Sequence, residues 1–252
     1  MAEKLTVKDL QGMKANKQKI VAAVVYEAQM AAMMERAGAD VLSVGDSLGR
    51  AFLAHTEEGA FTVDEMIPFC RAVARTAKRA VVNCDMPGGV LNGGPKAAAE
   101  AARRLVDVGA QTVKVDTRPD MDGLFDCAVA VVKAGVDVYP QIGHVDYRQR
   151  WTGSEAIKLL VDKAKALEDA GAVMIDLTGV ASEVYGAVSQ AVRIPVLGGQ
   201  ATHEADGKIF VSYALVGYAS AALDQQGDNP NAAKFIVGVA DKAFASVRSG
   251  DY

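Results

Sequence analysis

Four aspartates and one lysine stand where short apolar stretches of this sequence end. Asp46, Asp85, Asp116 and Asp176 each come at or just past the last apolar residue of such a stretch, and Lys114 precedes Asp116. Several carboxylates are costly to bury together unless a cation neutralises them, and a hard divalent cation prefers oxygen ligands. The set therefore predicts a metal site if the fold brings these side chains together. Taken singly, each aspartate could instead cap a helix or start a turn.

The elements that must position these residues follow a repeated order of amphipathic helix, glycine and short Val/Ile-rich run. Gly38, Gly109, Gly135 and Gly171 each stand between such a helix and such a run. Glycine can adopt the left-handed conformation that ends a helix, after which the chain turns into a strand. The repeat predicts a parallel sheet with helical crossovers.

The same pattern places eight strands and seven helices along the chain. The strands are predicted near residues 19–25, 40–45, 80–85, 111–116, 136–141, 172–177, 194–198 and 208–213. The helices are predicted near residues 28–37, 63–76, 95–108, 122–134, 154–170, 182–192 and 230–248. Eight strands in 252 residues favour a single-domain (β/α)₈ TIM barrel over residues 1–252, with an open doubly wound sheet as the alternative. In such a barrel the carboxyl ends of the strands carry the active site, which is where the aspartates fall.

Composition excludes several classes of partner. The net charge is −4, from 27 basic and 31 acidic residues, so we expect neither nucleic acid nor a membrane as partner. Three widely spaced cysteines form neither a disulfide framework nor a zinc pattern, which favours a reducing cytoplasm. We expect no signal peptide and no transmembrane span, because no apolar run approaches about 18 residues. No GxGxxG follows a predicted strand, which weakens a dinucleotide site.

The string Val44-Gly45-Asp46-Ser47-Leu48-Gly49 resembles the ketopantoate hydroxymethyltransferase (3-methyl-2-oxobutanoate hydroxymethyltransferase) family. That family belongs to the phosphoenolpyruvate mutase/isocitrate lyase group of barrels. His55 and the string from Phe61 to Met66 follow at the family's spacing. Further similar strings follow in the same order: Asp85-Met86-Pro87, Val113-Lys114-Val115-Asp116, Ile194-Pro195-Val196-Leu197-Gly198 and Asp206-Gly207-Lys208-Ile209. The resemblance is collinear over most of the chain.

The resemblance implies a role for each candidate residue. Asp46 and Asp85 would hold Mg²⁺ or Mn²⁺, with Asp116 near the metal's water shell. A small 2-oxo acid would chelate the metal and be bound by the substrate-binding residues Gly45, Ser47, Lys114 and Gln141. Asp176 would remove the C3 proton, and Lys114 would also act in catalysis. In the family the enolate carbon then attacks formaldehyde delivered by 5,10-methylenetetrahydrofolate, a reaction of the EC 2.1.2 class, and the subunits assemble into a homo-oligomer.

Several positions depart from the family pattern. Asp116 and Asp176 stand where the family has glutamates, so each side chain is one methylene shorter. Gln141 stands where the family has a histidine, and Ala214 stands where an acid is expected. These changes leave the proposed metal–enolate core in place. They predict a divergent member that acts on another 2-oxo acid or another carbonyl partner.

Three alternatives stay open from the sequence. One is a C–C lyase or phosphomutase-like enzyme of the same barrel group, of the aldolase type, acting on a related 2-oxo acid. Another is a barrel that has lost catalysis and serves in binding. The last is a metal-free aldolase with Lys114 as a Schiff-base lysine. Nearby acids argue against that role, because they favour the charged ammonium over the nucleophilic amine.

Overall fold

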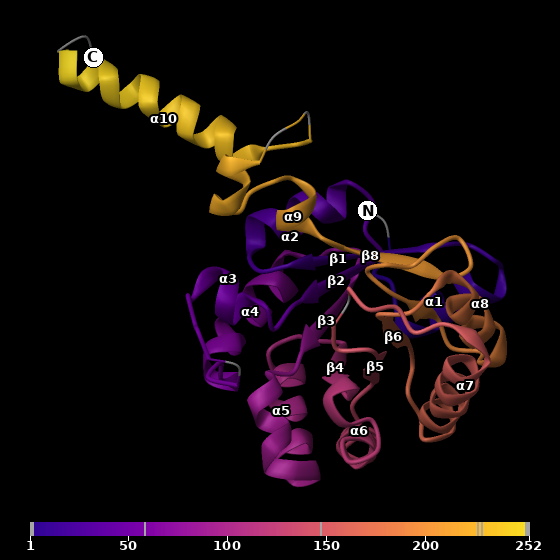
Figure 1. Ribbon diagram of the computed structural model, residues 1–252. Helices are drawn as coiled ribbons and strands as arrows, with labels where there is room; N and C mark the ends of the chain where they lie inside the picture. The colour runs from indigo at the N-terminus through magenta and orange to yellow at the C-terminus, as the bar shows by residue number, and fades with distance from the viewer. Residues whose placement is uncertain (1–2, 58, 147, 226, 228, 250–252) are drawn as a thin grey trace. The chain divides into compact units, whose positions relative to one another are not determined.

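The chain folds into two compact units, residues 1–209 and 210–252. The computed structural model describes residues 3–57, 59–146, 148–225, 227 and 229–249. The strands are β1 (Ile20–Val25), β2 (Val41–Val44), β3 (Val81–Asp85), β4 (Thr112–Asp116), β5 (Val138–Gly143), β6 (Ile175–Thr178), β7 (Val196–Leu197) and β8 (Gly207–Val211). They form one sheet in the order β7-β6-β5-β4-β3-β2-β1-β8 (Figure 1).

The sheet curls into a nearly closed barrel, as the sequence predicts. All six strand pairs from β1–β2 to β6–β7 are parallel. Two backbone hydrogen bonds bring the eighth strand to the seventh: Asp206 N donates to Val196 O at 3.0 Å and Ile209 N to Gly198 O at 3.1 Å. The predicted (β/α)₈ fold is therefore confirmed.

The seventh and eighth strands differ from their predicted ranges. The seventh covers only Val196–Leu197, because Pro195 just before it has no N–H to donate to a ladder. The eighth ends at Val211, because Ser212 begins a helix. The other six predicted strands overlap the observed ones.

Helices follow most strands and lie outside the barrel (Figure 1). In the first unit they are α1 (Val7–Ala15), α2 (Ala28–Arg36), α3 (Leu48–Phe52), α4 (Val63–Thr76), α5 (Gly94–Asp107), α6 (Phe125–Lys133), α7 (Gly153–Asp169) and α8 (Ser182–Ala191), with 3₁₀ turns η1 (Gly88–Gly93) and η2 (Arg118–Asp120). The four glycines predicted to end helices have φ values of 103°, 115°, 81° and 104° at Gly38, Gly109, Gly135 and Gly171. Only glycine adopts this region without strain, so the glycine-terminated αβ repeat is confirmed.

Helix α1, which the sequence patterns did not predict, closes the amino-terminal end of the barrel. A capping box between Thr6 and Asp9 starts this helix. Its Leu10 and Met13 are buried in a cluster with residues that lie in the strands or just before them: Ile20, Ala22, Val41, Val81, Tyr139, Met174 and Leu197. Lys14 adds hydrogen bonds from its ammonium to Ser189 O at 2.7 Å and Ile194 O at 2.9 Å. This end of the barrel is an apolar core.

The second unit contains α9 (Ser212–Leu215), η3 (Ser220–Asp224) and α10 (Ala232–Ser249). Asn231 starts α10, because its Oδ1 accepts from Lys234 N at 2.9 Å while its Nδ2 donates to Ala222 O at 2.6 Å. The helix predicted near residues 230–248 is confirmed. Within the described part of the chain, no helix combines the length and the apolar character needed to span a bilayer.

Candidate active site

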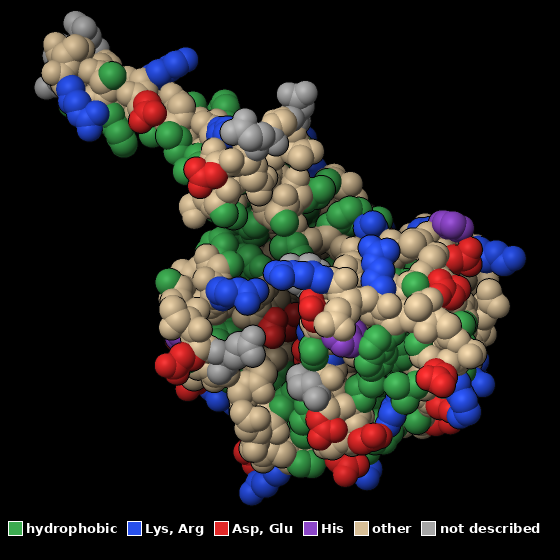
Figure 2. Space-filling model, in the orientation of Figure 1, with side chains coloured by type: hydrophobic (Ala, Val, Ile, Leu, Met, Phe, Trp, Pro, Cys, Tyr) green, Lys and Arg blue, Asp and Glu red, His purple; other side chains and the backbone are tan. Residues whose placement is uncertain are grey.

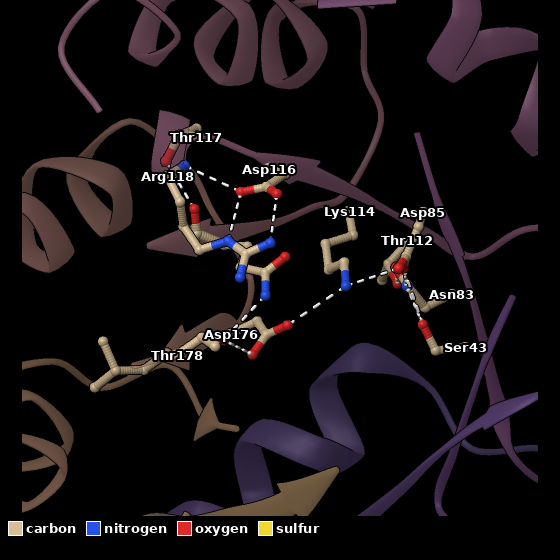
Figure 3. A network of polar contacts seen from close by, with 12 residues as sticks. Ser43, Asn83, Asp85, Thr112, Lys114, Asp116, Thr117, Arg118, Asp176 and Thr178 are labelled. Carbon is tan, nitrogen blue, oxygen red and sulfur yellow. Dashed lines mark hydrogen bonds and ion pairs between the residues drawn. The ribbon is translucent and has the colours of Figure 1, made fainter. Parts of the chain in front are cut away.

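The predicted functional residues gather at the carboxyl-terminal end of the barrel, here called the mouth. Asp85 ends β3, Lys114 and Asp116 close β4, and Asp176 lies in β6. Figure 3 shows these side chains around one space, with the Lys114 ammonium between Asp85 and Asp176. The fold thus brings together the residues that the sequence analysis selected at the ends of different strands.

Asp85 is held by a buried chain of hydrogen bonds. Its Oδ1 accepts from Ser43 Oγ at 3.0 Å and from Asn83 Nδ2 at 2.8 Å, and its Oδ2 pairs with Lys114 Nζ at 2.7 Å. Asn83 Nδ2 also donates to Ser43 Oγ at 2.7 Å, and Asn83 Oδ1 accepts from Thr112 Oγ1 at 2.9 Å. Buried polar groups with partners on all sides are rigid, so the Asp85 carboxylate is fixed in direction.

Lys114 is a buried cation between two buried acids. Its Nζ lies 2.7 Å from Asp85 Oδ2 and 3.4 Å from Asp176 Oδ2. Burial lowers the pKa of Lys114, but the negative charges of Asp85, Asp176 and Asp46 outweigh it, and the pKa is raised above its usual value. The side chain therefore stays an ammonium at neutral pH, which opposes the Schiff-base alternative because that mechanism needs a free amine.

Asp46 follows β2 at the rim of the mouth, where part of its side chain remains exposed. Desolvation, followed by the negative charge of Asp85, raises the pKa of its carboxyl to about 6, although the positive charge of Lys114 acts in the opposite direction. No hydrogen bond to the Asp46 carboxylate is found among the described residues. Asp46 thus presents to the mouth an acid with no hydrogen-bond donor, beside the fixed acid of β3.

The neighbours of Asp46 are shaped for close approach. A Cβ atom on Gly45 would lie 2.7 Å from Val24 Cγ1, so only glycine fits at this point. Ser47 Oγ is 2.7 Å from the hydroxyl of the buried Tyr26. This contact ties the start of α3 to the barrel and holds Ser47 beside the acid.

Asp176 is the most loosely held of the buried acids. Only 3% of the residue is exposed, and its two carboxylate contacts are long: 3.4 Å to Lys114 Nζ and 3.3 Å from Thr178 Oγ1. Desolvation raises its pKa, whereas Lys114 and Arg118 lower it without cancelling the effect. Gln141 reaches this acid indirectly, because its Nε2 donates to Thr178 Oγ1 at 3.0 Å. A desolvated carboxylate with weak partners can accept a proton.

Asp116 has a partner that the sequence analysis did not single out. Arg118 Nε donates to Asp116 Oδ1 at 2.9 Å, Arg118 Nη2 donates to Oδ2 at 2.6 Å, and the Arg118 backbone N donates to Oδ1 at 3.0 Å. Both oxygens of Asp116 are therefore bound by one guanidinium in a fork geometry. Asp116 lies in the mouth as predicted, but as half of an ion pair. The missed signal was the position of Arg118, two residues past a strand-end aspartate.

The comparisons with known proteins agree with the motifs. A family model described as ketopantoate hydroxymethyltransferase matches residues 4–248. The chain belongs to the ketopantoate hydroxymethyltransferase family. The 3-methyl-2-oxobutanoate hydroxymethyltransferase of Ignicoccus hospitalis is 31% identical over 258 residues, which cover 99% of this chain and 97% of that relative. The resemblance stated from the sequence is confirmed.

Solved structures share the fold at low sequence identity. A 2,3-dimethylmalate lyase of the phosphoenolpyruvate mutase/isocitrate lyase superfamily has a TM-score of 0.67 and 20% identity, with 87% of this chain and 85% of that chain covered. A phosphonopyruvate hydrolase solved with oxalate and Mg²⁺ has a TM-score of 0.66 and 14% identity, with 98% and 88% covered. The ketopantoate hydroxymethyltransferase family member described here therefore has the same barrel fold as these two proteins.

His55, part of the string that resembles the ketopantoate hydroxymethyltransferase family, has a local structural partner. Its Nε2 lies 2.9 Å from Glu65 Oε1. Glu65 forms the capping box of α4 with Thr62, whose backbone N donates to Glu65 Oε2 at 2.9 Å. This contact fixes the segment that contains His55 to the start of α4.

Asp46 and Asp85 are the residues of this family member that could hold a divalent cation. The mouth contains four carboxylates, from Asp46, Asp85, Asp116 and Asp176, against the two cations Lys114 and Arg118, which leaves two negative charges uncompensated. Figure 2 shows acidic side chains inside a hollow of the barrel face, with Lys and Arg side chains near its edge. No group of three His, Cys, Asp or Glu side chains among the described residues is arranged to hold a metal. A hard cation that keeps waters or ligand oxygens in most positions, as Mg²⁺ does, would need only Asp46 and Asp85 from the protein, and Asp85 Oδ2 would then exchange its pair with Lys114 Nζ, 2.7 Å away, for the cation.

Proposed function

We propose that this chain enolises a small 2-oxo acid with the help of Mg²⁺ or Mn²⁺ and then joins a one-carbon unit to C3, as in ketopantoate synthesis from 3-methyl-2-oxobutanoate. One observation carries the proposal: the acid pair Asp46 and Asp85 lies in the same mouth as the buried acid Asp176. The relative from Ignicoccus hospitalis is named 3-methyl-2-oxobutanoate hydroxymethyltransferase. The structure of the phosphonopyruvate hydrolase contains Mg²⁺ and oxalate, a small diacid. The site offers an acid pair for a cation and a separate acid for a proton.

The binding step uses the fixed groups of the mouth. Asp46 and Asp85 would hold the cation, which, when bound, polarises the 2-oxo group and stabilises the enolate. Lys114 and Ser47 would bind the substrate carboxylate, since the ammonium and the hydroxyl donate hydrogen bonds. The backbone of Gly45 would lie beside the substrate next to Ser47, and Gln141, whose Nε2 donates to Thr178 Oγ1, would contribute its amide to substrate binding.

The proton step belongs to Asp176. Its raised pKa makes the carboxylate a stronger base than an exposed aspartate, and its long contacts leave lone pairs for the C3 proton. Lys114 stabilises the ionised form before the transfer, because its ammonium lies 3.4 Å away. After C–C bond formation, the same acid can return the proton to the new hydroxymethyl oxygen.

The electrophile and the assembly are further parts of the proposal. We propose 5,10-methylenetetrahydrofolate as the one-carbon donor: water hydrolyses it to formaldehyde and tetrahydrofolate, the enolate carbon attacks the formaldehyde carbon, and the formaldehyde oxygen becomes the hydroxymethyl oxygen. This places the enzyme in the EC 2.1.2 class, and we further propose a homo-oligomer in the cytoplasm. The three cysteines are free and buried, which agrees with a reducing compartment. Light scattering after size-exclusion chromatography would give the number of subunits.

Deuterium exchange tests the proposed function. With Mg²⁺ in D₂O, the C3 proton of 3-methyl-2-oxobutanoate should exchange, as followed by proton NMR. Chelation of the metal should abolish the exchange, and so should the Asp85→Asn variant. Asp162→Asn is the matched control, because Asp162 is exposed on α7, where it pairs with Lys158. Absence of exchange with a panel of 2-oxo acids would overturn the proposal, whereas exchange without one-carbon transfer would overturn only the assignment of the electrophile.

A further inference from the structure

Arg118 is a cation in the mouth to which the proposed reaction gives no role. It lies in η2, directly after β4, and its side chain is 19% exposed. Among the described residues, its guanidinium neither caps a helix nor joins a network of surface ion pairs. Instead, its charge acts on Asp176 and Asp46, the proposed base and one proposed metal ligand. Figure 3 shows that Arg118 lies in the same mouth as Asp176, beside which the substrate would lie.

Asp116 fixes this guanidinium and leaves part of it available. A guanidinium has five N–H donors, and the fork on Asp116 uses one from Nε and one from Nη2. The remaining donors, on Nη1 and Nη2, have no protein acceptor among the described residues. Figure 3 shows the Arg118 guanidinium beyond Asp116, on the side of Asp176. A rigid guanidinium with an unused edge is the group that proteins use to bind carboxylates in a bidentate manner.

The position of Asp176 decides which part of the substrate would meet this edge. If Asp176 removes the C3 proton, C3 must lie beside it, and a group carried beyond C3 would lie in the part of the mouth that holds Asp176 and Arg118. In the proposed function the first carboxylate would be bound by Lys114 and Ser47. The free edge of Arg118 would then lie at the far end of the substrate.

We infer that Arg118 binds a second carboxylate, so that the preferred substrate is a 2-oxo dicarboxylate whose far carboxylate is attached beyond C3. This inference rests on the proposed function, because it uses the placement of C3 beside Asp176. It assigns Arg118 as a specificity-determining residue and Asp116 as the residue that positions it. A purely structural ion pair, which ties η2 to β4, is the competing explanation.

A matched pair of acids tests the inference. 2-Oxopentanoate and 2-oxoglutarate have the same chain length and differ by a terminal methyl group against a carboxylate. In D₂O with Mg²⁺, kcat/KM for C3 exchange should favour 2-oxoglutarate by about 10- to 100-fold, the value of one or two charge-assisted hydrogen bonds. The Arg118→Met variant should reduce this ratio to about one. An equal ratio in wild type and variant, or a wild-type preference for the monoacid, would overturn the inference.

Two further variants control for loss of folding and for a change in the net charge of the protein. Arg118→Lys retains the charge without the fork, and we expect an intermediate ratio in a protein whose thermal melting matches wild type. Arg50→Met removes an exposed cation that lies close enough to Tyr26 to lower its pKa, and it should leave the ratio unchanged. If Arg50→Met lowers the ratio as much as Arg118→Met, the preference comes from the overall field and the assignment of Arg118 fails.

The same assay separates this inference from the proposed function. If wild-type enzyme exchanges the C3 proton of neither acid, and of no other 2-oxo acid, the proposed function fails and this inference fails with it. If exchange occurs and depends on Asp176 but the ratio ignores Arg118, only the inference fails.

Discussion

The two ends of the barrel bury opposite kinds of side chain on the same strands. At the amino-terminal end, α1 covers an apolar cluster, whereas the mouth holds four aspartates and two cations. Strand β3 shows the change within five residues: Val81 lies in the apolar cluster, Asn83 in the hydrogen-bonded chain and Asp85 in the mouth. These three residues share one face, because side chains alternate along a strand.

The groups that stabilise the fold and the groups that could react thus lie at opposite ends of the barrel. Apolar burial at the closed end stabilises the fold, since it removes hydrocarbon from water. At the mouth, burial raises the pKa of Asp46 and Asp176, which means that the ionised forms are destabilised in the folded chain. The same groups are available for a cation and for a proton. Substitutions at the mouth should therefore lower activity with little loss of stability, whereas substitutions at the closed end should lower stability with little loss of activity.

The largest effect should follow from Asp176→Asn at the mouth. Loss of the base should reduce kcat for C3 exchange by about 10²- to 10⁴-fold, the usual contribution of general-base catalysis. The free energy of unfolding should not fall by more than about 1 kcal/mol, because the amide removes a desolvated charge and Lys114 retains Asp85. Exchange kinetics and urea unfolding measure the two quantities. Full exchange activity in this variant would exclude Asp176 as the base.

Leu10→Ala at the closed end should lower stability and leave activity unchanged. Leu10 is fully buried in the apolar cluster, so its truncation should lower the free energy of unfolding by about 2–5 kcal/mol. The kinetic constants of the folded variant should match wild type, since the cluster lies at the other end of the strands. Urea unfolding and exchange assays at low temperature test this. A large change in kcat would show that the two ends are coupled.

Much of the fold could be predicted from the sequence because its signals are local. Glycine at Gly38, Gly109, Gly135 and Gly171 ends a helix by a backbone rule that needs no knowledge of the rest of the chain. Helix α1 was missed because its hydrophobic residues are few, and what they contact is set by strands far along the sequence.

The site could be predicted as a set of residues but not as a set of contacts. The strand-end rule selected Asp46, Asp85, Asp116 and Asp176, and the barrel brings them to one mouth. Which acid pairs with which cation depends on side-chain directions that no spacing gives. The sequence therefore predicted Asp116 beside the metal, and its fork with Arg118 emerged only from the structure. The role of Asp116 toward the metal stays a prediction.

The smallest effect should come from Asp46→Asn, and its dependence on pH gives the sharpest test of the comparison. In the folded chain the pKa of Asp46 is raised from 3.8 to about 6, chiefly by desolvation. Between these values the folded chain binds the proton more tightly than the unfolded chain, so this contribution to stability is present at low pH and is lost as pH rises through about 6. Without metal, the asparagine variant should therefore exceed wild type in stability above pH 6.

We expect a gain of about 1 kcal/mol at pH 8, because solvent at the exposed rim screens most of the shift, and no gain near pH 4. Urea unfolding in a chelator at the two pH values measures it. Mg²⁺ should reverse the order at pH 8, since only the wild type retains both carboxylates for the cation. Near pH 5 the added Mg²⁺ should stabilise wild type less, because the metal must displace the proton from Asp46. A stability gain from Asp46→Asn that is the same at pH 4 and pH 8 would show that Asp46 is not desolvated. It would also contradict the proposal that Asp46 and Asp85 bind a cation.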